Sequence, residues 1–258
     1  MTLIGPIDIL NLALSVLRNI KLTIEYDGTG FAGWQRQRYQ KTVQGELEKE
    51  LEELTGEKVT LIAAGRTDSG THSFGQVANF KTHFKIPARI FPKALMPLLS
   101  KGILVRKAEE VPLKFNSRND SKSKAYRYRI LLGDSALLRR YAWRYTFPVN
   151  LNFVMKASRV ILGRHDFSSF CVAKSRKESN ICRISKVSWK KTKNMLEFEI
   201  EGDRFLHSMV RILVGTLMEV GRGMITPEEF KKILQAKDRK KAGRTAPACG
   251  LYLVEVKY

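Results

Sequence analysis

Cysteine and histidine are scarce in this chain of 258 residues, and their spacing excludes two kinds of site. The cysteines are odd in number, stand far apart and form no C-x-x-C pair, which argues against a disulfide framework. They are Cys171, Cys182 and Cys249. The four histidines show no metal-ligand spacing with them. We therefore expect free thiols in a reducing compartment, the cytoplasm, and no metal site.

Long apolar runs are missing as well. The apolar stretch at residues 7–17 is far too short to span a bilayer. Asp8 within it and the lack of a basic start argue against a signal peptide. Residues 1–17 are therefore interpreted as an N-terminal extension of unknown role, and no membrane partner is expected.

Acidic residues are too few to balance the basic ones. Lys and Arg total 46, whereas Asp and Glu total 25, so the formal net charge is +21 and the pI is near 10.0. A charge of this size indicates a polyanionic partner. Nucleic acid is favoured over the plainer alternative, a charge that only keeps the protein soluble.

Apolar periodicity predicts the secondary structure of the first half of the chain. Thr42 is a good cap for a helix, and the five glutamates of that helix are expected to face solvent. Strands are expected at residues 20–26, 59–63, 76–80 and from 102 onward, with helices at 42–54 and 88–99. This β-α-β-β-α-β order is typical of a ferredoxin-like unit.

The second half of the chain repeats the mixture of strands and helices. Strands are expected at residues 184–190, 195–200 and 251–256, helices at 151–162, 205–220 and 226–236, and a loop at 165–170. We therefore predict an α+β fold in which two ferredoxin-like halves share one long, mainly antiparallel sheet around a central catalytic cleft. The expected domains are residues 18–110 and 111–258, after the extension at 1–17.

A polar stretch, residues 64–73, separates the strands expected at 59–63 and 76–80. It carries Arg66, Asp68 and His72, together with glycines that let the backbone approach a ligand. A carboxylate held beside a guanidinium is expected to stay ionised, which suits a nucleophile or a base. By spacing alone, however, Thr-Asp-Ser-Gly is also ordinary turn chemistry.

A second glycine-rich stretch, Gly28-x-Gly30-x-x-Gly33, matches a dinucleotide-binding fingerprint in form only. That fingerprint requires an apolar helix at the loop and an acid at the end of the next strand. Here the loop leads into a basic segment that contains Arg36, and the next strand has no terminal acid. No nucleotide cofactor is therefore expected, and the aromatic and arginine side chains suit RNA instead.

Basic and aromatic residues alternate between positions 115 and 129, where Lys122, Lys124, Arg127 and Arg129 surround Tyr126 and Tyr128. Two interpretations remain open. The segment is either a charged edge strand or a platform on which an extruded base stacks.

Arg211 stands in the apolar helix expected at 205–220, on the face shared with His207 and Ser208. A guanidinium in such a helix needs a carboxylate partner. Asp203 and Glu219 are candidates for a purely structural ion pair.

The stretch Gly65-Arg66-Thr67-Asp68-Ser69-Gly70-Thr71-His72 resembles the G-R-T-D-x-G-V-H signature of the TruA-type tRNA pseudouridine synthases, with Thr71 in place of the family's Val. The resemblance extends from about residue 18 to 258. Further matching blocks lie at residues 25–35, 115–118, 126–128, 165–170, 205–211 and 245–253.

This resemblance implies an enzyme that isomerises uridine to pseudouridine at positions 38, 39 or 40 of the tRNA anticodon stem-loop. It also implies that no cofactor is used and that the enzyme is a homodimer in which one tRNA contacts both subunits. Pseudouridine formation breaks the N-glycosidic bond, rotates the uracil and forms a C–C bond, so no redox cofactor or energy source is required.

The resemblance also implies residue roles. Asp68 is the catalytic carboxylate, Arg211 pairs with it, Tyr126 stacks on the target uracil, and Arg66 assists extrusion of the base. His72, Arg36 and Leu251 are expected on the substrate-binding surface. Whether the aspartate attacks the base, attacks C1′ or removes a proton stays open.

Two rival classes remain for comparison. A non-catalytic RNA-binding protein explains the charge and the aromatics but gives no role to Asp68 or Arg211. A nucleotide-dependent enzyme explains the Gly28 loop and little else.

Overall fold

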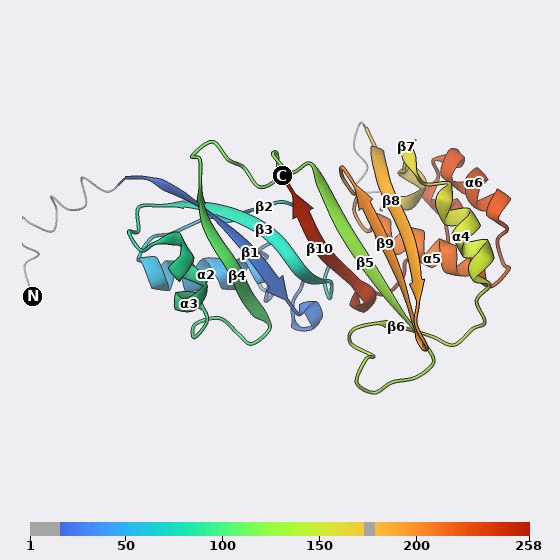
Figure 1. The fold of residues 1–258 in the computed structure, drawn as a ribbon, viewed down its shortest axis with the longest axis horizontal. Helices are drawn as coiled ribbons and strands as arrows, with labels where there is room; N and C mark the ends of the chain where they lie inside the picture. The colour runs from blue at the N-terminus through green and yellow to red at the C-terminus, as the bar shows by residue number, and fades with distance from the viewer. Residues whose placement is uncertain (1–15, 173–178) are drawn as a thin grey trace, which may run out of the picture.

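A computed structural model describes residues 16–172 and 179–258. The described strands form one ten-stranded sheet in the order β4-β1-β3-β10-β5-β9-β8-β7, with β2 paired to β3 and β6 paired to β5 (Figure 1). All neighbouring pairs on this path are antiparallel except β3–β10. The mixed content and the long, mainly antiparallel sheet confirm the predicted fold class.

The N-terminal half places β1 between β3 and β4, with helices α2 and α3 gathered at this end of the sheet (Figure 1). Its elements are β1 (Arg18–Tyr26), α2 (Val43–Thr55), β2 (Ile62–Ala63), β3 (His72–Thr82), α3 (Phe91–Leu95) and β4 (Ile103–Val111). Helix α2 begins where the Thr42 hydroxyl accepts a hydrogen bond from the Gly45 N–H, and it ends at Gly56, whose φ is 72°. The element order matches the predicted ferredoxin-like unit.

The C-terminal half gathers α4, α5 and α6 at the β8–β7 end of the sheet (Figure 1). Its strands are β5 (Ser123–Leu132), β6 (Trp143–Tyr145), β7 (Gly163–Asp166), β8 (Ile181–Lys191), β9 (Met195–Gly202) and β10 (Leu251–Lys257). Its helices are α4 (Leu151–Arg159), α5 (Met209–Gly221) and α6 (Pro227–Ala236). Helix α6 begins and ends as predicted, because Thr226 and Glu229 form a reciprocal capping box.

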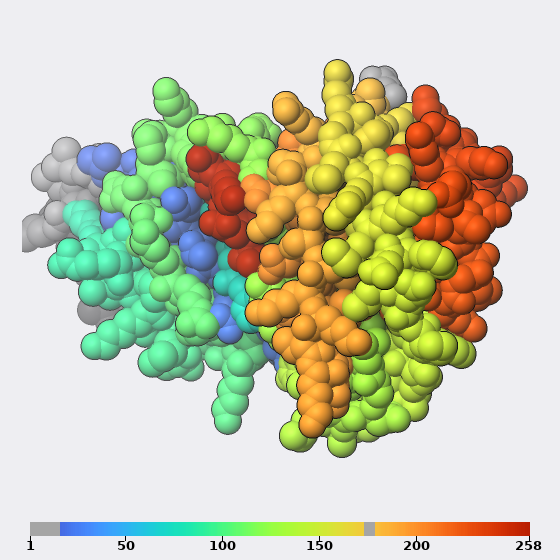
Figure 2. All heavy atoms as spheres, turned by 45° about the vertical axis from the view of Figure 1, so that its right-hand side comes forward, coloured from blue at the N-terminus to red at the C-terminus, as the bar shows by residue number. Residues whose placement is uncertain are grey.

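The last strand of the chain joins the two halves. β10 runs parallel to β3 through Tyr252 and Leu253 and antiparallel to β5. Figure 2 shows its side chains between the N-terminal half and the strands of the C-terminal half. Because β3 begins where the polar stretch 64–73 ends, this stretch lies at the junction of the halves. Each half has its own apolar cluster, although the predicted boundary at residues 110 and 111 stays a prediction.

The strand expected at 59–63 is largely wrong, since only Ile62 and Ala63 pair with β3. The backbone of Leu61 is instead satisfied by side chains of α2: its N–H donates to Glu48 and its carbonyl accepts from Gln44. The expectation that all five α2 glutamates face solvent is therefore also wrong. Glu48 and Glu50 are buried, and Glu48 substitutes for a neighbouring strand.

Two predicted helices are shorter than expected. Helix α3 ends at Leu95 instead of continuing to 99, because Pro97 disfavours helical geometry in the residue before it. Helix α5 begins at Met209 instead of 205, since Ser208 has a left-handed backbone that no α-helix continues. The loop expected at 165–170 is in part strand β7 and in part a 3₁₀ turn at Ser168–Phe170.

The interpretation of residues 115–129 as a charged edge strand is wrong. β5 lies in the interior of the sheet, between β10 and β9. The predicted extension, residues 1–17, lies outside the described residues apart from Val16 and Leu17. Within the described ranges, no helix is both long enough and apolar enough to cross a membrane.

Candidate active site

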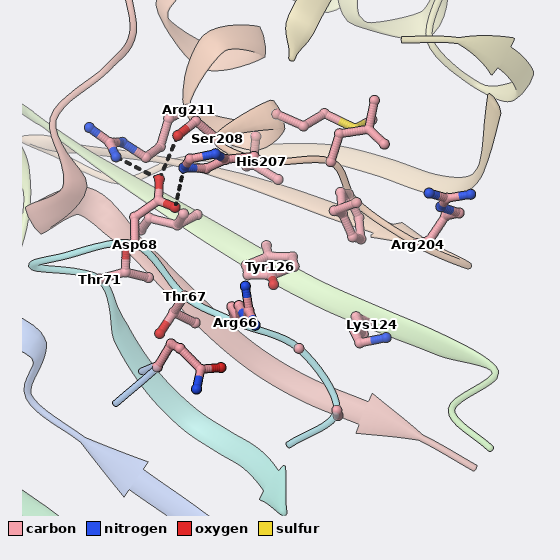
Figure 3. A pocket seen from close by; sticks show the side chains of 18 of the residues that line it. Arg66, Thr67, Asp68, Thr71, Lys124, Tyr126, Arg204, His207, Ser208 and Arg211 are labelled. Atoms are coloured by element: carbon pink, nitrogen blue, oxygen red, sulfur yellow. Dashed lines mark hydrogen bonds and ion pairs between the residues drawn. The ribbon is translucent and has the colours of Figure 1, made fainter. Parts of the chain in front are cut away.

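A cavity of about 1520 Å³ opens where the two halves meet. The polar stretch 64–69 forms one wall, β5 contributes Lys124 and Tyr126, and the segment 203–211 leading into α5 forms another wall (Figure 3). Leu251, the first residue of β10, also lines it. Residues more than 140 positions apart in the chain, such as Asp68 and Arg211, thus meet in one hollow.

Asp68 is held by side chains from the start of α5. Its Oδ2 accepts a hydrogen bond of 2.7 Å from the Ser208 hydroxyl and one of 2.6 Å from Arg211 Nη1. Its Oδ1 lies 3.6 Å from His207 Nε2 (Figure 3). These contacts also place the carboxylate at the N-terminal end of a helix, where the helix dipole favours negative charge.

The structural ion pairs considered for Arg211 are wrong. Asp203 accepts a hydrogen bond from the backbone N–H of Arg183, and Glu219 accepts one from that of Arg244. The guanidinium of Arg211 pairs with Asp68 instead. It lies in the first turn of α5, because the helix begins at Met209 and not at residue 205 as expected.

The Arg211 guanidinium is fixed from behind as well. Its Nε donates to the Ala246 carbonyl at 2.8 Å, and the Ala246 N–H donates to the Arg211 carbonyl at 3.0 Å. Gly215 lets this segment approach α5, because a Cβ at that position would lie 1.8 Å from the Arg244 carbonyl oxygen. The guanidinium therefore has little freedom to turn away from Asp68.

Gly28 and Gly33 pack against the backbone of the Asp68 loop. Their presence in the sequence therefore has an explanation other than nucleotide binding. A Cβ on Gly28 would lie 2.1 Å from the Thr71 carbonyl oxygen, and one on Gly33 would lie 2.6 Å from that of Thr67. Gly33 also has a φ of 92°, which L side chains rarely adopt. The Gly28-x-Gly30-x-x-Gly33 stretch thus lets two loops pack backbone against backbone.

Further hydrogen bonds fix the same loop. The Tyr26 hydroxyl lies 2.8 Å from the Thr67 hydroxyl, and the Gln76 amide donates to the Gly65 carbonyl at 2.9 Å. The Trp34 N–H donates to the Thr67 carbonyl. Asp68 therefore stands on a rigid loop, which favours a site over the ordinary turn that its spacing also allowed.

Tyr126 lies on β5 and is only 7% exposed. Its ring packs edge-on against Phe205 at 4.9 Å between centroids. Burial raises the pKa of its phenol, and the nearby Tyr26 and Asp68 raise it further. The hydroxyl therefore stays protonated over the ordinary working range and offers a neutral donor.

Four cations on the cavity wall, Arg66, Arg118, Lys124 and Arg204, have no carboxylate within ion-pair distance among the described residues. Lys124 is 9% exposed and donates to the Ser121 hydroxyl at 2.8 Å. Burial lowers the pKa of Lys124, and nearby Asp203 opposes that shift. Unneutralised cations in a hollow indicate an anionic ligand.

The cations that alternate with Lys124 and Tyr126 along β5 behave differently. Arg127 pairs with Glu199 at 2.7 Å, and Arg129 pairs with Glu197 at 2.9 Å. Successive side chains of a strand point to opposite faces. On one face of the sheet, Arg127 and Arg129 are therefore neutralised by glutamates. On the other face, Lys124 remains available to a ligand.

Two of the residues expected on the substrate surface do not line this cavity. His72 is buried, and its Nδ1 accepts from the Gly28 N–H at 3.1 Å, so Nε2 donates to the Arg140 carbonyl. Burial lowers the pKa of the His72 imidazole. Arg36 pairs with Glu48 at 3.0 Å beside a separate surface hollow. The other predicted residues, Asp68, Arg211, Tyr126, Arg66 and Leu251, all line the cavity.

Sequence reasoning missed two side chains that contact or approach Asp68. Ser208 and His207 were recognised only as neighbours of Arg211 on a helix face. A serine directly before an apolar helix is a typical N-cap signal, and it could have marked the true start of α5. In the described part of the chain, no three His, Cys, Asp or Glu side chains gather closely enough to hold a metal ion.

Comparisons with known proteins agree over most of the chain. A family model described as tRNA pseudouridine synthase matches residues 22–120 and 157–258. The tRNA pseudouridine synthase A of Acetivibrio thermocellus is 47% identical over 244 residues, 94% of this chain and 100% of the relative. Proteins of the same name from Clostridium acetobutylicum and Caldicellulosiruptor bescii are 46% and 43% identical, with the same coverage. Asp68 and Arg211 both lie within the ranges that the family model matches.

Proposed function

Since this chain belongs to the tRNA pseudouridine synthase family, which isomerises uridine to pseudouridine in tRNA, we propose that Asp68 is the carboxylate on which its reaction depends. One observation carries this proposal. Asp68 is a carboxylate in a large cavity, held by Arg211 and Ser208 on one oxygen and placed on a loop that the rest of the fold immobilises. Such preorganisation is what catalysis by a single carboxylate requires.

The isomerisation balances within the substrate. The bond between uracil N1 and ribose C1′ breaks, the detached base rotates, a bond forms between C5 and C1′, and the proton that C5 loses is matched by one gained at N1. The protein must stabilise the ribose or the base while the two are apart and keep the base from leaving. Asp68 serves the first need, and the walls of the cavity serve the second.

Tyr126 is the side chain best suited to hold the uracil. Its ring already packs against Phe205 and lines the cavity, and stacking of a base on an aromatic side chain contributes about 1–3 kcal/mol. Its protonated hydroxyl can donate a hydrogen bond to the base or ribose. Leu251 also lines the cavity and offers an apolar contact there.

The unpaired cations of the cavity wall give the RNA backbone its binding surface. Arg66, Lys124 and Arg204 line the cavity (Figure 3), and we expect them to contact the phosphates of a flipped nucleotide. Extrusion of a nucleotide costs a few kcal/mol and least where pairing is already weak. The resemblance to the TruA-type synthases supplies the rest of the proposal: the target is the anticodon stem-loop, at position 38, 39 or 40, and Arg66 assists extrusion.

We also propose that the enzyme works in the cytoplasm as a homodimer in which one tRNA contacts both subunits. The dimer follows from the resemblance to the family, and the large positive charge supports only an RNA partner. Sedimentation of the protein with and without tRNA tests the proposed homodimer. Full activity of a protein that sediments as a monomer would contradict it.

The experiment that tests the activity uses tRNA labelled with tritium at uracil C5. Three transcripts each retain uridine at only one of positions 38, 39 and 40. We expect tritium release without any added cofactor from at least one transcript, and chemical mapping of pseudouridine at that position. Tight binding of all three without release would instead support a non-catalytic RNA-binding protein.

A further inference from the structure

Ser208 has an unusual backbone for a serine. Its φ is 57° and its ψ is 12°, in the left-handed region that disfavours L side chains other than Asn and Asp. Within residues 16–172 and 179–258, only one other non-glycine residue, Lys237, has a positive φ. Strained residues of this kind cluster at functional sites, where the surrounding structure holds them in place.

Ser208 also does not do what a serine at a helix start ordinarily does. At the starts of α2 and α6, Thr42 and Thr226 have extended backbones, and their hydroxyls accept hydrogen bonds from N–H groups of the first turn. Ser208 occupies the same position before α5, but its hydroxyl caps no N–H of the helix. It donates to Asp68 Oδ2 instead.

The consequence is that the two oxygens of Asp68 have different surroundings. Oδ2 accepts from both Ser208 Oγ and Arg211 Nη1, whereas Oδ1 lies 3.6 Å from His207 Nε2, beyond hydrogen-bond distance. A single donor leaves a carboxylate free to rotate about its Cβ–Cγ bond. Two donors that approach one oxygen from different residues fix the plane of the carboxylate.

We propose that Ser208 is a positioning residue, whose left-handed backbone directs its hydroxyl to Asp68 Oδ2 and so presents Oδ1 to the substrate. The inference rests on the proposed role of Asp68 and adds to it which oxygen reacts. The strained backbone has a reason in this arrangement: an extended Ser208 would direct its hydroxyl at the helix, as Thr42 and Thr226 do.

Ser208→Gly separates the effect of the hydroxyl from that of the backbone, because glycine lacks the hydroxyl and adopts a φ of 57° without strain. A hydrogen bond to a charged group contributes enough for its loss to lower kcat by about 10- to 100-fold. We expect that loss in kcat with KM within twofold of the parent and Tm unchanged or raised. Ser208→Ala should lose the same factor in kcat while its Tm falls, since alanine loses the hydrogen bond without relieving the backbone strain.

Lys237→Gly is the matched control. Lys237 has a φ of 51° at the end of α6 and does not line the cavity. Glycine relieves the same kind of strain there, so kcat should not change. A parallel loss of kcat in this variant would mean that the assay reports altered folding, and it would overturn the interpretation.

Two results would distinguish a failure of this inference from a failure of the proposed function. Full kcat in Ser208→Gly, with Asp68→Asn inactive, would overturn the positioning role alone. Full activity in Asp68→Asn would overturn both. In a double-mutant cycle of Ser208→Gly and Arg211→Lys, the kcat of the double variant should fall by less than the product of the two single losses, because both residues act on one oxygen. Strictly multiplicative losses would contradict a shared target.

Discussion

Replacing Arg211 by lysine tests how Asp68 is aimed, since lysine keeps the charge and removes the planar, two-pronged donor. Arg211 uses two of its nitrogens at once. Nη1 donates to Asp68 Oδ2 at 2.6 Å, and Nε donates to the Ala246 carbonyl at 2.8 Å. The single ammonium of a lysine can satisfy one of these acceptors but not both in the same geometry.

The size of the effect follows from which acceptor is left unsatisfied. If the ammonium stays on Asp68, the fully buried Ala246 loses its partner, which costs about 1–3 kcal/mol and lowers Tm by about 2–10 °C in a chain of this size. If the ammonium moves to Ala246, Asp68 loses a charge-assisted hydrogen bond, and kcat falls by about 10- to 100-fold. Because a lysine that stays on Asp68 also contacts the carboxylate in a different geometry, we expect kcat to fall by about 10- to 100-fold in either case.

The assay is tritium release per folded molecule, with the folded fraction taken from thermal unfolding at the assay temperature. Arg127→Lys is the control, because Arg127 pairs with Glu199 away from the cavity, and its kcat should not change. If Arg211→Lys lowers Tm while the folded fraction retains the full rate, the ion pair is structural only and the assignment of Arg211 is refuted.

Three further predictions concern the support of the site. Thr71→Val should raise the free energy of unfolding by about 1 kcal/mol in urea titrations, with kcat unchanged, because the buried Thr71 hydroxyl has no hydrogen-bond partner in the described structure. Gly33→Ala should lower that free energy by about 2–4 kcal/mol and also lower kcat, since its Cβ would press on the Thr67 carbonyl. Burial raises the pKa of Tyr26 to about 12, so the unfolded chain loses its phenolic proton first as pH rises above 10. Stability should therefore fall between pH 10 and 12, by about 3 kcal/mol from this residue, and Tyr26→Phe should flatten the fall.

The fold could be predicted from the sequence wherever a local pattern decides the structure. The alternation in β1 and the cap at Thr42 have local causes, and both were predicted correctly. The strand expected at 59–63 failed because Glu48, a charged residue from α2, replaces the neighbouring strand. No pattern within residues 59–63 carries that information.

The candidate site shows the same division. Asp68 stands in a recognisable signature, but its partner on α5 is fixed by tertiary packing. Three acids were possible partners for Arg211 in the sequence, and only the close approach of α5 to the Asp68 loop selects one. The left-handed backbone of Ser208 could not be predicted either, because serine rarely adopts it and only its contact with Asp68 explains it.

The most direct test of the central claim is tritium release by Asp68→Asn. Asparagine keeps the size of the side chain and its acceptor for Ser208 and Arg211, but it removes the negative charge. The variant should fold, bind tRNA within a few-fold of the parent, and release no detectable tritium from C5-labelled tRNA. Pseudouridine formed by this variant at a substantial fraction of the parent rate would contradict the account.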